Sequence, residues 1–251
     1  MKKHPKKKIS MAAIFTVILF LLAGIAVGFY INRGRVEVAS EQTEASRSIV
    51  ESDPESIPAY AGSDYVILNN DKPCFNAWDL ENITGEHYSE LDRLGRCGAA
   101  VALLHETMMP KAARGEIGQV RPSGWKQTKY EGLIDADPPF LYNRSHLIAY
   151  ALTGQNDNER NLITGTRYMN THAMLPWEET VMRYLNDSGN HVLYRVTPYF
   201  RGNELLARGV EMEAYSVEDQ GSLSYHVFVY NIQPGVKLNY ATGDSTLDKG
   251  Q

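Results

Sequence analysis

The sequence predicts an α+β domain with an antiparallel sheet, preceded by one N-terminal transmembrane helix. The sheet is indicated by C-terminal segments that alternate apolar and polar residues and are rich in Val and Tyr. These segments are His191–Phe200, Leu205–Val217 and Ser224–Gln233. Tyr168–Asn186 has a helical pattern interrupted at Pro176, and the uncharged run Met11–Ile31 has the length of about 20 residues that crosses a bilayer.

Five segments are predicted along the chain. They are a basic cytoplasmic tail (1–10), a transmembrane anchor or signal segment (11–31), an extracytoplasmic linker (32–59), the folded domain (60–245) and a short tail (246–251). The linker is rich in Glu, Ser and Ala and poor in aromatic residues, which is typical of a solvated spacer.

The charges around the apolar run predict its orientation. Five lysines precede it, whereas only Arg33 and Arg35 follow closely, so the N-terminus is expected in the cytoplasm. We favour an uncleaved single-pass anchor in the cell membrane. The alternative is cleavage near Val38-Ala39-Ser40, which would make the domain a secreted protein. Both alternatives place the folded domain outside the cytoplasm.

Between linker and helix the expected elements are shorter. Tyr65–Leu68, Cys74–Trp78 and Asn161–Thr164 are predicted strands. The apolar run Cys97–His105 fits either a buried strand or a helix, because periodicity does not separate the two. Lys111–Lys129, with three glycines and a proline, is predicted to be a loop.

The chain has two cysteines, Cys74 and Cys97, and neither belongs to a CxxC pair. Outside the cytoplasm a disulfide between them is a candidate, closing a loop of about 24 residues and stabilising by roughly 3 kcal/mol. Two buried free thiols are the equally weighted alternative.

The overall charge argues against a general nucleic-acid coat protein. The formal net charge is −5, and the chain after the five N-terminal lysines has 20 basic against 30 acidic residues, which is −10. Lys111–Lys129 differs, with five basic residues against Glu116 alone. This basic stretch with Trp125 suits contacts to a nucleic-acid backbone and stacking on bases. A merely solvated loop is the alternative.

One histidine stands in a context that favours catalysis. Hydrolysis of a phosphodiester needs a base for water, a cation for the developing charge and groups that hold the phosphate. His146, with an ordinary pKa near 6.5, can act as the base, and Arg144 lies two residues before it. The other histidines are interpreted as packed or exposed residues.

A set of motifs carries a family resemblance. The tetrapeptide is Asn143-Arg144-Ser145-His146, and it is followed by Asn161-Leu162-Ile163-Thr164, Tyr168-Met169-Asn170 and Glu178. This order resembles the DNA/RNA non-specific endonucleases, the ββα-metal or His-Me finger nucleases, in their bacterial secreted or surface-anchored branch. The resemblance extends from about Val66 to Thr242 and is most specific over Tyr142–Leu185.

The resemblance implies a role for each matched residue. His146 is the implied general base, and Asn170 binds one Mg²⁺ directly, with Mn²⁺ as an alternative ion. Glu178 reaches the metal through water, Asn161 supports the site, and Arg144 is the motif arginine. Arg121, Trp125, Lys126 and Lys129 are the candidate substrate-binding residues of the basic loop.

Two residues depart from the family pattern, and one spacing can be checked. Asn143 stands where the family usually has Asp, and Ser145 where it has Gly; we interpret both as tolerated variants. On a continuous helix Asn170 and Glu178 would be about 80° and ~12 Å apart, which fits a water-mediated role for Glu178. Pro176 would kink such a helix.

The resulting hypothesis is a metal-dependent endonuclease that cuts DNA, with RNA as an open second substrate, without strong sequence preference. The first alternative is a non-catalytic surface module that binds nucleic acid with the same fold, with Asn143 and Ser145 as signs of decay. An unrelated membrane-tethered interaction domain is the third hypothesis.

Overall fold

A computed structural model of the chain describes residues 57–249. The predicted tail 1–10, the predicted membrane helix 11–31 and the linker up to residue 56 lie outside the described residues. Within residues 57–249, no helix combines the length and apolar character needed to cross a membrane.

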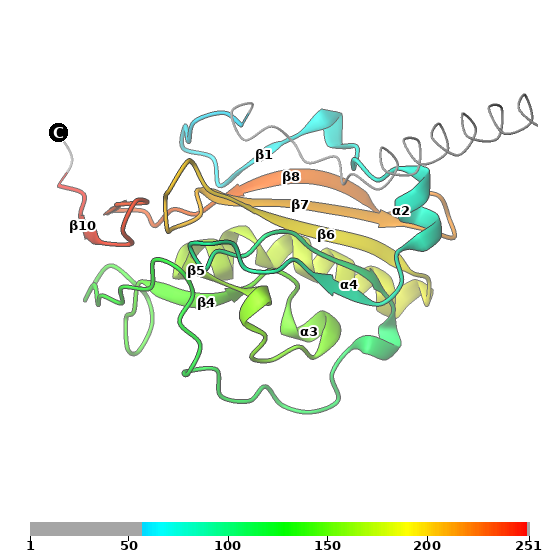
Figure 1. Cartoon of the computed structure of the whole chain (residues 1–251), viewed down its shortest axis with the longest axis horizontal. Coiled ribbons are helices and arrows are strands. Elements are labelled where there is room, and N and C mark those ends of the chain that lie inside the picture. The colour runs from blue at the N-terminus through cyan, green and yellow to red at the C-terminus, as the bar shows by residue number, and fades with distance from the viewer. Residues whose placement is uncertain (1–56, 250–251) are drawn as a thin grey trace, which may run out of the picture. The chain divides into compact units, whose positions relative to one another are not determined.

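A six-stranded antiparallel sheet forms the centre of the domain, with strand order β1-β8-β7-β6-β3-β2 (Figure 1). Its strands are β1 (Tyr65–Ile67), β2 (Glu86–Tyr88), β3 (Ala100–Leu104), β6 (Val192–Tyr199), β7 (Gly209–Ser216) and β8 (Ser224–Tyr230). The three predicted C-terminal strands are therefore confirmed as antiparallel neighbours. The open alternative at Cys97–His105 is settled as a strand.

The sheet is buried on both faces, and the faces differ in character. In β7, Val210, Met212 and Ala214 point into the main hydrophobic core, whereas Glu211 and Glu213 point to the opposite face, because successive side chains of a strand alternate. The apolar residues on one face of each alternating strand pattern therefore pack into the main core. The second face carries buried charged groups.

The hairpin and helix of the site pack on the main-core face (Figure 1). β4 (Tyr142–His146) pairs antiparallel with β5 (Leu162–Thr166), and the connection holds α3 (Tyr150–Thr153) and the 3-10 turn η4 (Glu159–Asn161). A π-helical turn, η5 (Met169–Ala173), and the helix α4 (Leu175–Ser188) follow. This β-β-α order is the one that the family resemblance predicts.

Local sequence explains two features of this unit. A Cβ at Gly165 would lie 2.2 Å from Oγ of Ser145, so the hairpin requires glycine there. Pro176 lies in the first turn of α4, where its missing N–H has no helical partner to lose. The helical pattern of Tyr168–Asn186 is therefore interrupted near Pro176, as predicted. The interruption is a junction between the π-turn η5 and the helix α4, not a kink within one helix.

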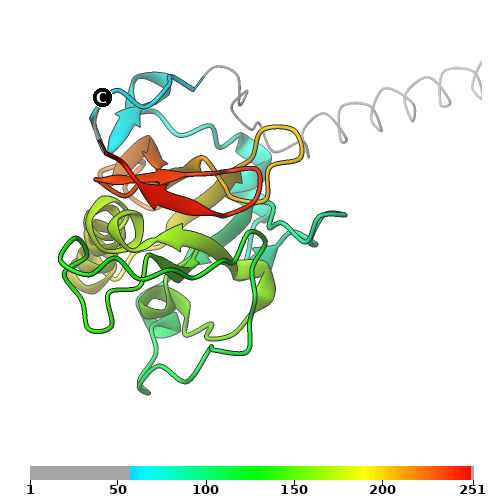
Figure 2. The ribbon, with the colours of Figure 1, turned by 90° about the vertical axis from the view of Figure 1, so that its left-hand side faces the viewer.

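The prediction of a strand at Cys74–Trp78 is wrong. α2 (Ala77–Asn82) begins there, because Asn76 accepts a hydrogen bond from the backbone of Asp79 and Asp79 accepts one from Asn76. This capping box satisfies two backbone donors at the start of the helix. Three further short elements are the 3-10 turns η2 (Asn69–Asp71) and η3 (Glu106–Met108) and the hairpin of β9 (Val236–Leu238) with β10 (Ser245–Leu247), seen in front in Figure 2.

The candidate disulfide between Cys74 and Cys97 is also contradicted, since both thiols are free. Cys97 is buried in the main core, with its Sγ 3.3 Å from the carbonyl oxygen of Leu162. Cys74 lies on the other face of the sheet, where its Sγ is 3.9 Å from Nδ1 of His226. The sheet separates the two sulfur atoms, so the alternative of free thiols holds, with Cys74 only half-buried.

Candidate active site

His146 is the last residue of β4, and its ring is held in a defined orientation. Its Nε2 lies 2.9 Å from the carbonyl oxygen of Asn156. A carbonyl oxygen can only accept, so Nε2 carries the proton and Nδ1 of the neutral ring carries a lone pair that can accept. Nδ1 faces a guanidinium nitrogen of Arg114 at 3.4 Å. This ring has the tautomer that a general base requires. Arg114 donates a long hydrogen bond to the Nδ1 lone pair, so this bond has to open before Nδ1 takes a proton.

The surroundings keep that base neutral. Burial, with 7% of the residue exposed, is the main cause that lowers the pKa of His146 to about 4, and the positive charge of Arg114 lowers it further. The hydrogen bonds to the carbonyl oxygens of Asn156 and Gln155 act in the opposite direction. At neutral pH the imidazole is thus unprotonated and able to take a proton from water.

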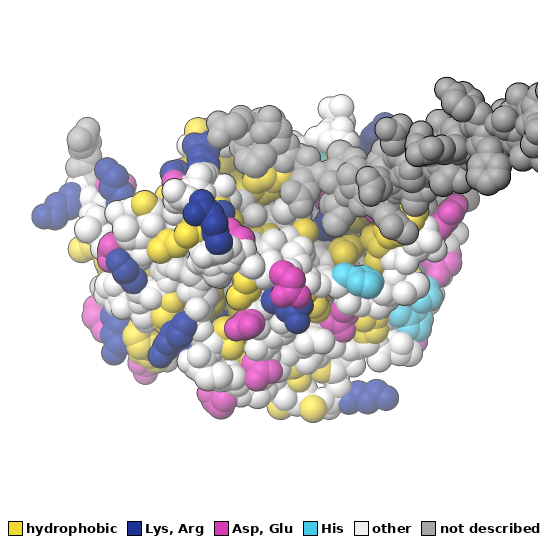
Figure 3. Space-filling view, in the orientation of Figure 1, with side chains coloured by type: hydrophobic (Ala, Val, Ile, Leu, Met, Phe, Trp, Pro, Cys, Tyr) yellow, Lys and Arg dark blue, Asp and Glu magenta, His cyan; other side chains and the backbone are white. Residues whose placement is uncertain are grey.

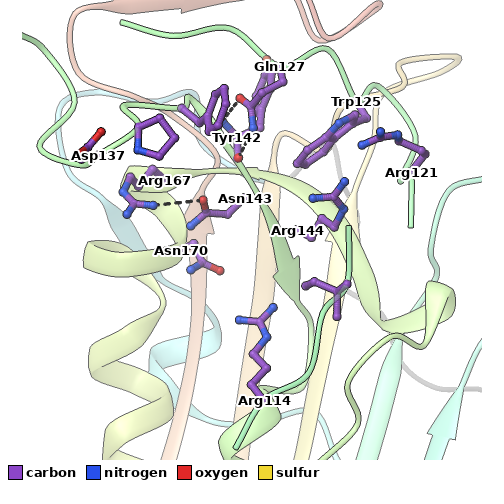
Figure 4. A pocket seen from close by; sticks show the side chains of 13 residues that line it. Arg114, Arg121, Trp125, Gln127, Asp137, Tyr142, Asn143, Arg144, Arg167 and Asn170 are labelled. Atoms are coloured by element: carbon purple, nitrogen blue, oxygen red, sulfur yellow. Dashed lines mark hydrogen bonds between the residues drawn. The ribbon is translucent and has the colours of Figure 1, made fainter. Parts of the chain in front are cut away.

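A polar cavity of about 610 Å³ lies along β4 and the basic loop (Figure 4). Its lining includes four arginines, two asparagines and an indole ring: Arg114, Arg121, Arg144, Arg167, Asn143, Asn170 and Trp125. Arg114 also contacts His146, so the predicted base and the predicted metal ligand Asn170 belong to one site.

Asn170 comes from the π-turn between β5 and α4. Within residues 57–249 its side chain has no hydrogen-bond partner, and in Figure 4 it points toward Asn143 and Arg167. The Asn143 amide oxygen accepts a long hydrogen bond of 3.5 Å from Arg167. The carboxamide of Asn170 is thus free to bind an ion.

The role of Arg144 as a catalytic or phosphate-binding group stays a prediction, and its side chain also makes structural contacts. Its Nε donates to the carbonyl oxygen of Val120 at 2.6 Å, and its Nη2 donates to the carbonyl oxygen of Gly118 at 2.8 Å. The guanidinium also lies over the ring of Trp125, 4.2 Å from the centroid. Arg144 therefore fixes the basic loop against β4, although it still lines the cavity.

Asn161 is fully buried and holds the chain that follows the histidine. Its amide oxygen accepts from the backbone N–H of Ile148 at 2.8 Å, and its amide nitrogen donates to the carbonyl of the same residue at 2.9 Å. This double hydrogen bond fixes the backbone two residues after His146. The position fits the supporting role that the resemblance implies.

Glu178 is not among the residues that line the cavity. It lies in the first turn of α4, 8% exposed, and burial followed by the charge of Glu179 raises its pKa to about 8. Its charge also raises the pKa values of Tyr194 and Tyr225, which places it at the boundary with the sheet. The structure thus places Asn143 and Asn170 on the cavity wall and His146 beside it, in contact with the lining residue Arg114, whereas Glu178 is not in the cavity lining.

The predicted substrate residues divide in a similar way. Arg121 and Trp125 line the cavity. Lys126 instead pairs with Asp244 at 2.8 Å, and Lys129 lies over the ring of Phe140, 5.2 Å from its centroid. Those two lysines are outside the cavity lining.

Two cavity arginines were not singled out from the sequence. Arg114 belongs to the basic stretch Lys111–Lys129, and the charge count of that stretch was its only signal. Arg167 lies between β5 and the π-turn that carries Asn170, and its place within the block of motif residues was its only sequence signal. Both guanidiniums point into the cavity in Figure 4.

The donor set fits a hydrated magnesium ion. Asn170 offers a partner-free amide oxygen, and Mg²⁺ prefers oxygen ligands while keeping several waters. The arginines around it suit phosphate oxygens, which carry the compensating negative charge. A His base on a β-hairpin, an asparagine on the following turn and a helix after it together define a ββα-metal type of nuclease site.

Comparison with known proteins agrees with that class. A model of the DNA/RNA non-specific endonuclease family matches residues 77–218, more than half of the chain, and the chain belongs to this family. A deoxyribonuclease of Streptococcus dysgalactiae subsp. equisimilis is 33% identical over 108 residues, which are 41% of this chain and 32% of that protein. The match thus spans about a third of that relative's length.

Solved structures show the same fold. NucA from Streptococcus agalactiae with magnesium bound has a TM-score of 0.63 and 28% identity, covering 72% of this chain and 86% of that one. The metal-free NucA structure has a TM-score of 0.65 at 26% identity, with 82% and 95% covered. The Sda1 nuclease with bound zinc has a TM-score of 0.58 at 26% identity, with 66% and 83% covered.

Proposed function

We propose that this protein is a metal-dependent endonuclease that hydrolyses phosphodiester bonds of DNA without strong sequence preference, with RNA as a second substrate to be tested. The observation that carries the proposal is the orientation of His146. Its Nε2 donates a hydrogen bond to a backbone carbonyl, and its unprotonated Nδ1 faces Arg114, one of the arginines that line the cavity. The relatives' names, a deoxyribonuclease and two nucleases, support the same reaction.

The residues divide the work as follows. Nδ1 of His146 removes a proton from water, and the water oxygen forms a bond to phosphorus as the bond to the leaving 3′ oxygen breaks. Arg114, Arg121 and Arg167 hold the phosphate oxygens, and Asn170 holds the ion. When bound, Mg²⁺ supplies positive charge to the phosphate and to the leaving oxygen. The magnesium in the NucA structure supports this choice, with Mn²⁺ as a substitute to be compared.

Glu178 is proposed to act on the ion through water. Burial and Glu179 raise its pKa to about 8, and a nearby cation would lower that pKa by favouring the ionised form. Asn161 is proposed to support His146 through Ile148.

The distribution of charge supports binding of the substrate at this cavity. On the face shown in Figure 3, Lys and Arg side chains gather toward the end where β10 lies, and acidic side chains are interspersed. The chain after the N-terminal lysines is acidic overall, so a cavity with four arginines is a local attraction for a polyanion.

The test is cleavage of supercoiled plasmid by the full chain with Mg²⁺ and with EDTA. We expect nicking that EDTA abolishes and that His146→Ala reduces by roughly 10²- to 10⁴-fold, the usual contribution of a general base. His87→Ala changes an exposed histidine and serves as the matched control. Salt-sensitive DNA binding without any cleavage would favour the non-catalytic module instead. Parallel assays on single-stranded DNA and RNA identify the preferred substrate.

We also propose that residues 11–31 anchor the protein in the cell membrane, with residues 60–245 acting outside the cytoplasm. The support is the uncharged length of the run and the lysines before it. Membrane fractionation and protease treatment of intact cells test it. We expect a membrane-bound, externally digestible domain, whereas a soluble protein of reduced mass in the medium would indicate a cleaved signal.

A further inference from the structure

A second cluster of reactive side chains lies on the sheet face opposite the main core. Cys74, Glu213 of β7 and His226 of β8 each place one donor atom within 4.8 Å of the others. The glutamate and the histidine are buried, and Cys74 is half-buried. The cavity with His146 and Asn170 belongs to the hairpin on the other face, so this cluster is separate from the nuclease site.

Neighbouring groups already orient two of these three side chains. Oε1 of Glu213 accepts from the backbone N–H of Cys74 at 2.6 Å, and Oε2 accepts from Arg195 at 2.6 Å. Nε2 of His226 is hydrogen-bonded to the carboxylate of Glu211. A carboxylate behind a histidine fixes its tautomer and ring direction, which is the arrangement found around metal-binding histidines.

The remaining contacts of the cluster are replaceable. Nδ1 of His226 lies 2.9 Å from the carbonyl of Lys72 and 3.9 Å from Sγ of Cys74. The thiol otherwise receives only a long contact of 3.6 Å from the Asn69 side chain. Bonds of about 2.3 Å to sulfur and ~2.0 Å to nitrogen at a tetrahedral angle separate those two atoms by roughly 3.5 Å. The separation of Sγ and Nδ1 therefore needs only a small contraction, and a carboxylate oxygen of Glu213 lies within 4.8 Å of both atoms.

Charge balance also permits a divalent cation. Without an ion, the two carboxylates of Glu211 and Glu213 are balanced by Arg195 and by a doubly protonated His226, while Cys74 is a thiol. A divalent cation that displaces one proton from the thiol and one from the imidazole leaves the total charge unchanged. Two protons are released for each ion bound, and no buried charge is left uncompensated.

The chemical nature of the three ligand atoms determines which metal ion the site prefers. A thiolate and an imidazole with one carboxylate are ligands that zinc prefers, whereas Mg²⁺ takes oxygen ligands. We propose that Cys74, Glu213 and His226 form a zinc site, with water in the fourth position, that fastens the segment around Cys74 to β7 and β8. This site is independent of the nuclease reaction, because none of its ligands lines the catalytic cavity.

Cobalt substitution tests the site in the full chain. A thiolate bound to Co²⁺ gives a charge-transfer band in the near ultraviolet, and no cysteine lines the catalytic cavity. We expect the band to saturate at one ion per chain, to disappear in Cys74→Ser and to persist in Asn170→Ala. Absence of the band in the wild type, or its persistence in Cys74→Ser, would overturn the proposal.

Thiol labelling of the wild type gives a second readout, and its melting temperature with zinc gives a third. In EDTA, half-exposed Cys74 should react with a maleimide, whereas Cys97, buried in the main core, should not. Stoichiometric zinc should slow labelling of Cys74 at least tenfold and raise the melting temperature of the wild type but not that of Cys74→Ser. Labelling at an equal rate with and without zinc would count against the site.

Discussion

Replacing Arg114 by glutamine tests the electrostatic coupling between the cavity and its base. The guanidinium lies 3.4 Å from Nδ1 of His146 and disfavours protonation of the ring. Its removal should therefore raise the pKa of His146. Two unit charges about 4 Å apart interact by about 1 kcal/mol in water and about 4 kcal/mol at an effective dielectric constant of 20.

The lower of these two values applies here. Arg114 is an exposed residue, and burial, not Arg114, is the main cause that holds the pKa of His146 at about 4. One pKa unit corresponds to about 1.4 kcal/mol. The expected shift for Arg114→Gln is therefore upward by about one unit, with most of the depression remaining.

The assay is the pH dependence of kcat/KM on a DNA substrate at fixed, saturating Mg²⁺. The acid limb of that profile reports the base of the free enzyme, so the limb should move to higher pH in Arg114→Gln. The variant should therefore lose more activity near pH 5 than near pH 8, relative to wild type. Arg114→Lys retains the charge, and Arg121→Gln removes a cavity charge that has no contact with His146; both should leave the limb in place. An unmoved or downward-shifted limb in Arg114→Gln would refute the reasoning.

Three further predictions concern the support, the stacking surface and the unusual motif residue. Asn161→Ala leaves two buried backbone groups of Ile148 without hydrogen-bond partners. It should lower the free energy of unfolding, measured by urea titration, by about 2 to 4 kcal/mol. A loss below about 0.5 kcal/mol would contradict this supporting role. Trp125→Ala should raise KM for single-stranded DNA about tenfold with a smaller change in kcat, since one stacked base contributes roughly 1–3 kcal/mol; an unchanged KM would exclude the stacking role. Asn143→Asp adds a carboxylate to the cavity wall. It should lower the half-saturating Mg²⁺ concentration several-fold, up to about tenfold. A higher half-saturating concentration would show that the new carboxylate binds Arg167 instead of the ion.

The sequence predicts the fold best where one periodic pattern corresponds to one buried face. The strands at His191–Phe200, Leu205–Val217 and Ser224–Gln233 are such cases, since every second side chain enters the main core. Cys74–Trp78 fails because its few apolar residues suggested a strand, while a two-residue capping box starts a helix at Ala77. The two hydrogen bonds of the capping box therefore determine the local structure, and the short apolar run does not.

The candidate site was predictable in its residues but less so in its geometry. The order of the motifs located His146, Asn161 and Asn170, yet the π-turn at Met169–Ala173 is not encoded in any spacing rule. The angle and distance between Asn170 and Glu178 expected for a continuous helix therefore do not apply, because the two residues lie in different helical elements. Contacts across the loop, such as that between Arg114 and His146, depend on tertiary folding and leave no local pattern.

Asn143 changes the balance of charge on which the whole cavity depends. Arg144 uses two of its five N–H donors on the backbone of the basic loop, so all four cavity arginines keep donors for phosphates. An aspartate at position 143 would neutralise one of them and would also attract the metal. With asparagine, the cavity keeps a stronger attraction for the substrate polyanion and a weaker one for the cation. The phosphate would then bring much of the negative charge that holds a bound ion, and metal binding would be coupled to substrate binding more tightly than with a carboxylate at position 143.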